Sequence, residues 1–180
     1  HVARLGLKRC LLLSAYGAPF TLCVGYGLSF SPVAHAGAMV PGLMPVFALV
    51  LGATFFGQSI SYRDGIACLF ILSGAGVILW HASGASKGEP VWMGHALFLT
   101  GALCWASFTV TVARSDVRPF LATAIVAVLS VLALAPIWVS LDMSRISAVE
   151  PSDVAAQAVF QGIVSGLVSL FAFGRALQLI

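Results

Sequence analysis

The sequence predicts an all-α integral membrane protein, a polytopic bundle of about six transmembrane helices. Of its 180 residues, 60% are hydrophobic and only 8% are charged, and the mean hydropathy is +1.04. Because soluble domains carry roughly 25% charged residues, this chain has too few to cover a surface that faces water. Its apolar runs are continuous and do not alternate as β-barrel strands do. We therefore expect a multi-pass protein of the plasma or inner membrane.

Six apolar runs, separated by short polar connections, are the expected helices. They span Cys10–Phe30, Val33–Phe56, Gly65–Ala82, Val91–Ala113, Pro119–Leu141 and Val154 to about Gly174. Their lengths are close to the ~20 residues that cross the hydrocarbon core of a bilayer. Because the connections are short, we expect helices that are adjacent in sequence to be antiparallel neighbours.

The basic residues predict that the N-terminus lies in the cytoplasm. This orientation leaves only Lys87 and Arg145 outside and agrees with the positive-inside rule. Trp80, Trp92 and Trp138 then fall near the outer interface, where an aromatic belt is expected. The basic residues on the inner side are Arg4, Lys8, Arg9, Arg63, Arg114, Arg118 and Arg175.

The run Val33–Phe56 contains two prolines, Pro41 and Pro45, and no formal charge. Each proline lacks a backbone N–H, so the carbonyls of Gly37 and Pro41 lose their helical donors. In lipid an unpaired carbonyl costs several kcal/mol unless it faces protein or a wet cavity. We therefore expect a broken helix that lines a path through the membrane, with Met39 and the two prolines on its wall.

Polar residues recur every fourth position in the last run, at Gln157, Gln161, Ser165 and Ser169. This spacing predicts one polar face of an α-helix. One interpretation is helix packing, in which small and hydroxyl side chains join neighbouring helices. The other is that Gln157, Gln161 and Ser165 form the wall of the path opposite Val33–Phe56, since two amides on one face need several hydrogen-bond partners.

Four further side chains are candidates for the path. His35 and His95 lie near the outer ends of their runs, and a histidine inside a membrane is costly and therefore a candidate for function. We assign His35 to the outer mouth of the path. Trp105 at mid-depth needs a partner for its indole N–H, and Tyr26 is similar. Both are predicted to supply aromatic surfaces to the path, with packing or lipid exposure as the alternative.

Other chemistries lack sequence support. The four cysteines are scattered one to a run without metal-ligand spacing, so we expect no metal and no cofactor. No GxSxG, HExxH or paired intramembrane aspartates occur, so no catalytic residues and no enzyme are expected, and Asp64 is interpreted as a helix cap. Nucleic-acid binding is not expected, because no basic run is present.

Between Tyr26 and Leu79 the sequence resembles the EamA-like domain of the drug/metabolite transporter superfamily. The resemblance rests on four motifs: Tyr26-Gly27-Leu28 at a helix end, Pro45-Val46-Phe47-Ala48-Leu49 at mid-depth, Gly57-Gln58-Ser59-Ile60, and Gly76-Val77-Ile78-Leu79. Gln58 stands where the family usually has a glutamate. Any role that the family's carboxylate has is therefore not expected of Gln58, whereas the expected fold is unchanged.

The resemblance implies ten helices in two inverted five-helix repeats, of which this chain carries helices 3 to 8. Residues 1–82 would end the first repeat, 83–90 would be an extracytoplasmic linker, and 91–180 would open the second repeat. Two further helices are then expected before His1 and two after Ile180.

The family suggests a gradient-driven transporter or exporter of small metabolites, amino acids or drugs that works by alternating access. Its partners would be a small-molecule substrate and the lipid bilayer, with a homodimer left open. A non-transporting accessory or structural subunit is the alternative, and an intramembrane enzyme is a weaker one. The accessory subunit would have no polar-lined interior.

Overall fold

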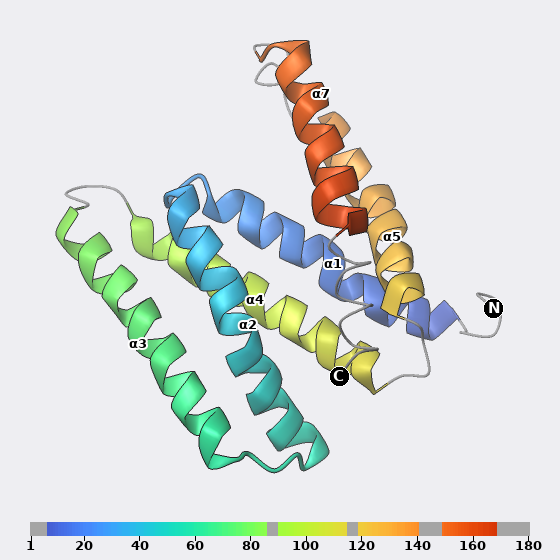
Figure 1. The fold of residues 1–180 in the computed structure, drawn as a ribbon. Coiled ribbons are helices and arrows are strands. Elements are labelled where there is room, and N and C mark those ends of the chain that lie inside the picture. Colours follow the sequence, from blue (N-terminus) through green and yellow to red (C-terminus); the bar gives the residue numbers. More distant parts are fainter. Residues whose placement is uncertain (1–6, 86–89, 115–118, 141–148, 169–180) are drawn as a thin grey trace. The chain divides into compact units, whose positions relative to one another are not determined.

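The computed structural model describes residues 7–85, 90–114, 119–140 and 149–168, and every element in these ranges is a helix (Figure 1). This confirms the predicted all-α class. The helices are α1 (Leu7–Gly27), α2 (Val33–Phe56), α3 (Tyr62–Ala85), α4 (Val91–Ala113), α5 (Pro119–Ser140), α7 (Pro151–Val159) and the π-helix η2 (Phe160–Val168), which continues α7.

The bounds of α2 and α4 are those predicted, whereas α1 ends three residues early, at Gly27. After Gly27 the chain tightens into a turn, in which the N–H of Phe30 donates to the carbonyl of Gly27 at 3.1 Å. The sixth run begins as an α-helix at Pro151 and becomes a π-helix at Phe160. Its predicted end near Gly174 lies outside the described residues.

Three helices are long and apolar enough to cross a membrane: α2, α4 and residues Tyr62–Trp80 of α3. The described apolar stretch of α5, Leu121–Ile137, is shorter. The other predicted membrane spans remain predictions.

The chain divides into two compact units, residues 1–117 and 118–180. In the first unit α4 packs against both α1 and α2, and α3 packs mainly against α2 (Figure 1). The contact between α1 and α2 is slight at most. The prediction that helices adjacent in sequence are neighbours is therefore wrong for this pair, because α4 lies between them.

The contacts of α4 also give the directions of the helices. Along α1, Gly27 lies near Gly94 and the Phe20 ring lies 5.0 Å from that of Trp105, so α1 and α4 are antiparallel. At the other face of α4, α2 runs parallel to it. The N-terminal ends of α2 and α4 meet through two histidines, and their C-terminal ends meet through an arginine and a phenylalanine.

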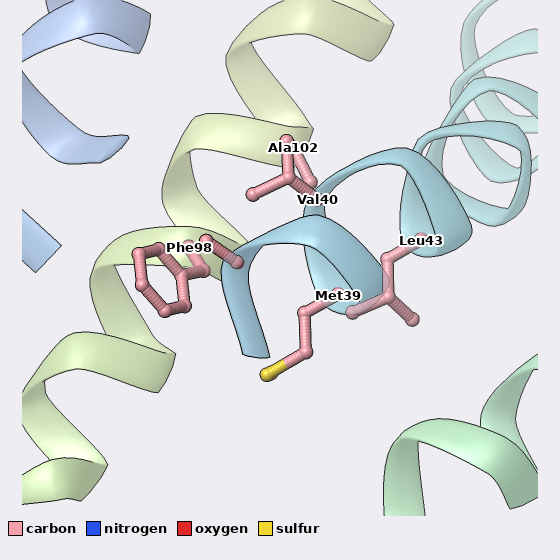
Figure 2. Packing of buried hydrophobic residues seen from close by; sticks show 6 residues of the cluster. Met39, Val40, Leu43, Phe98 and Ala102 are labelled. Carbon is pink, nitrogen blue, oxygen red and sulfur yellow. The ribbon is translucent and has the colours of Figure 1, made fainter. Parts of the chain in front are cut away.

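The core of the first unit is the interface of α2 with α4 (Figure 2). Met39 and Phe98 are its largest buried side chains, at 1% and 0% exposure. In a membrane, helices associate by close packing because lipid tails are as apolar as the side chains. The remaining members of the buried cluster are Ala36, Val40, Leu43 and Ala102.

The connection between α2 and α3 is closed by local hydrogen bonds. Gly57 has a positive φ of 64°, and the backbone N–H of Gln58 donates to the carbonyl of Gly52 at 3.1 Å, so this carbonyl in the last turns of α2 has a donor. Before α3, Ser61 donates to Asp64 Oδ2 from its N–H at 2.9 Å and from its hydroxyl at 2.7 Å. This arrangement confirms the capping role predicted for Asp64.

Gln58 also covers the end of α2 with its side chain. A Cβ built on Gly52 would lie 2.5 Å from Gln58 Oε1, so the amide group lies directly over this glycine. In this chain Gln58 therefore supports the end of α2.

Candidate functional site

The candidate site is a polar cluster at the N-terminal ends of α2 and α4. His35 Nδ1 lies 3.0 Å from His95 Nε2, and the Ser31 hydroxyl lies 3.2 Å from the same His35 nitrogen. His95 and Ser31 are buried, at 4% and 5% exposure, and His35 is half-buried. We call His35 and His95 the histidine pair.

The sequence around Ser31 and Pro32 sets the position of His35. Pro32, with a φ of −56°, immediately precedes α2, and the N–H of His35 donates to its carbonyl at 3.0 Å. His35 is therefore the third residue of α2 and lies on its first turn. Ala36 and Met39, which follow on the buried side of this helix, anchor it to the core.

Two glycines bring α4 to the same place. A Cβ on Gly94 would lie 2.5 Å from Ser31 Cβ and 2.8 Å from the carbonyl oxygen of Gly27. A Cβ on Gly27 would lie 2.6 Å from the Phe98 ring. Only hydrogen atoms at these two positions allow the end of α1 to lie on the first turn of α4, which places Ser31 beside His35 and His95.

The histidine pair limits how many protons the site can hold. A hydrogen bond between the two rings needs one N–H donor and one unprotonated acceptor nitrogen. If both rings were cationic, only donors would face each other, and two charges at this distance repel by about 5 kcal/mol at an effective dielectric constant of ~20. The N-terminal ends of two parallel helices further disfavour positive charge there. The observed contact therefore holds at most one cationic ring.

The structure separates the residues predicted to line the path in α2. Met39 is buried against α4, whereas Pro41 and Pro45 are on the exposed side of the helix. The expectation of a broken helix is wrong, because α2 stays helical through both prolines. Packing of its buried side against α4 holds the helix together despite two missing donors.

The two predicted aromatic residues have different surroundings. Tyr26 is 63% exposed, and its ring meets that of Phe30 edge-on at 5.1 Å. Trp105 is half-buried, between Phe20 of α1 at 5.0 Å and Phe108 of its own helix at 5.6 Å. Neither residue contributes to the polar cluster around the histidine pair.

The predicted polar face of the last run lies in the second unit. Gln157 is in α7, whereas Gln161 and Ser165 are in the π-helix, and all three are exposed within this unit. Because hydrogen bonds in a π-helix connect residues five apart, the four-residue spacing of an α-helical face does not continue past Phe160. That these residues face α2 stays a prediction.

Sequence reasoning assigned His35 to the mouth of the path and considered His95 a candidate, but it did not identify Ser31 or the contact between the two histidines. The two histidines are 60 residues apart, so no local motif joins them. The available signal was that both lie near the start of apolar runs on the same predicted side of the membrane. Among the described residues, no group of three His, Cys, Asp or Glu side chains could hold a metal ion.

The sequence and fold were compared with known proteins. No family model, no curated protein and no solved structure matches the chain. The likeness to the EamA-like domain therefore rests on the short motifs between Tyr26 and Leu79, and the candidate site rests on its own geometry.

Proposed function

We propose that this chain is part of a gradient-driven membrane transporter, which moves small metabolites, amino acids or drugs by alternating access. The observation that supports this most is the polar cluster of Ser31, His35 and His95 between helices of membrane-spanning length. Ionisable side chains inside a membrane are costly and typically mark the path of a substrate or ion. An accessory subunit would need no such cluster to pack its helices.

The backbone of α2 gives a second reason. Because Pro41 and Pro45 have no backbone N–H, the carbonyls of Gly37 and Pro41 lack their helical hydrogen-bond donors. Both prolines lie on the side of α2 that is exposed in the first unit. In the complete protein this side needs water or polar side chains from other helices. We propose that Gln157 and Gln161 face it across the substrate path.

The proposed architecture is that of the family resemblance. The chain would supply helices 3 to 8 of ten, with residues 83–90 joining two inverted repeats in a plasma or inner membrane. Substrate sites in such transporters lie between the two repeats, near the midplane of the bilayer. A homodimer is compatible with this arrangement.

A flux assay in liposomes tests the proposal. The full-length protein is reconstituted and supplied with a panel of amino acids, other small metabolites and drugs under proton and sodium gradients. We expect gradient-dependent flux of at least one solute class. No flux for any solute by a protein that is folded would overturn the proposal and favour the accessory-subunit alternative.

The path itself is tested by Gln161→Leu. This substitution removes an amide that we propose faces the substrate, so flux should fall about tenfold or more while the yield of folded protein changes little. Gln58→Leu is the reference for a structural role, because this side chain supports the end of α2 outside the proposed path, and it should lower flux only in proportion to folded yield. Equal losses of flux and folded yield for Gln161→Leu would mean that this amide only joins helices.

Cysteine labelling tests whether α2 moves during transport. Met39 and Val46 are buried on the α4 side of α2, so cysteines placed there become accessible only when the two helices part. In a cysteine-free background we expect Met39→Cys to react with a small water-soluble thiol reagent, and faster when the substrate is present. Ser59→Cys, in the exposed connection after α2, is the positive control. An inert Met39→Cys beside a reactive control would contradict a moving α2.

A further inference from the structure

We propose that the histidine pair is the proton-binding site of this protein, and that protonation of both rings separates the N-terminal ends of α2 and α4. The ligand is a proton, taken up on a ring nitrogen without any other bond being made or broken. The role of this proton in driving transport rests on the proposed function. The pH-dependent opening itself rests on the contact between the two rings.

The chemistry of the contact couples proton number to helix separation. With neither or one ring cationic, His35 Nδ1 and His95 Nε2 share a hydrogen bond at 3.0 Å. When both rings are cationic the two nitrogens each carry a hydrogen, the bond is lost and the charges repel. The proton that makes the second ring cationic can therefore bind only if the two rings move apart. Water that enters between them then solvates both charges.

The described helices of the first unit carry few other charged groups near this site. Neither α2 nor α4 carries an Asp, Glu, Lys or Arg anywhere along its length. The nearest polar group is the Ser31 hydroxyl, which is neutral. On α1, Tyr26 is at the C-terminal end, which lies next to the histidine pair, whereas Lys8 is at the opposite end of this helix. On α3, His81 is the one histidine. The one carboxylate on these four helices, Asp64, lies beside Arg63 at the start of α3, near the C-terminal end of α2 and away from the pair.

The rest of the unit determines which helix moves. The end of α1 is tied to α4 by the close approach of Gly27 and Gly94. At the C-terminal ends of α2 and α4, the guanidinium of Arg114 lies 4.7 Å from the centre of the Phe56 ring, and arginine keeps its charge at every relevant pH. We therefore expect α2 to swing away at its N-terminal end, with Ser31 and Pro32 as the joint and the Phe56–Arg114 contact as the fixed point.

The experiment measures this movement directly. Spin labels are attached at Ala34→Cys on α2 and Ala96→Cys on α4, both exposed positions next to the histidines, in the full-length cysteine-free protein in lipid nanodiscs. The distance between the labels is measured from pH ~8 to pH ~5, the range over which histidine changes charge. We expect the mean distance to increase by at least ~2 Å on acidification, as in other helix shifts.

Three substitutions identify the groups responsible. His35→Gln and His95→Gln each leave a hydrogen-bonding side chain but only one ring that can be cationic, so the pH-dependent increase should disappear in either variant. His81→Gln removes a histidine of α3 and should keep the full response. An unchanged label distance in the parent protein, or an equal increase in a folded His35→Gln or His95→Gln variant, would overturn the proposal.

The flux assay keeps this inference separate from the proposed function. Flux without any pH-dependent separation would leave the transporter proposal standing and refute the histidine pair as its proton site. A pH-dependent separation that requires both histidines, without flux of any solute, would support the proton site and refute the transporter.

Discussion

Helices α3 and α4 are nearly equal in length and both are apolar enough to cross a membrane, but they occupy different positions in the bundle. A third of the most apolar stretch of α4 is buried, 33%, against 0% for α3. The glycines Gly94 and Gly101 of α4 lie against α1, whereas a Cβ on Gly74 or Gly76 of α3 would have no neighbour within 4 Å. Glycines therefore occur both in a helix interface, as in α4, and on a face without a neighbouring helix, as in α3. Composition alone does not distinguish these two positions.

The largest expected difference between the two helices is for a buried phenylalanine. Phe98 of α4 is fully buried, so Phe98→Ala should lower the free energy of unfolding by about 3 kcal/mol, the lower end of the range for soluble cores. We expect the lower end because lipid tails are as apolar as the core that the ring leaves. The measurement is an SDS unfolding titration in mixed micelles.

The matched control is Phe70→Ala on α3. The Phe70 side chain is 75% exposed, so this substitution should change the free energy of unfolding by less than about 0.5 kcal/mol. Equal effects of the two substitutions would show that α3 is as well packed in the complete protein as α4 is in this unit.

Gly94→Ala should have the next largest effect. Its new methyl group would meet Ser31 Cβ at 2.5 Å and the Gly27 carbonyl at 2.8 Å, and a backbone atom cannot rotate away. We expect a loss of about 2 kcal/mol in the free energy of unfolding, within the range for overpacking. Gly76→Ala on α3 makes the same chemical change without a neighbour. If Gly94→Ala unfolds no more easily than this control, α1 does not approach α4 as closely as described.

Sequence patterns predicted the helices well and their arrangement less well. The bounds of α2 and α4 follow from apolar runs that end at Gly57 and Arg114, because such runs and their ends are local properties of the chain. That α4 lies between α1 and α2 depends on glycines whose neighbours are tens of residues away. The same holds for the candidate site: His35 was predicted, but its contact with His95 exists only through the packing of α2 on α4.

The smallest expected effect is for Gly74→Ala, and its sign is informative. A Cβ there meets nothing within 4 Å, and alanine is the better helix former, so the free energy of unfolding should be unchanged or rise by up to about 1 kcal/mol. The same unfolding titration, applied to the full-length protein, measures it. A loss of stability would show that another helix packs closely on this face of α3. The predicted ten-helix bundle requires a helix on this face of α3, whereas an α3 that faces lipid there has no such neighbour.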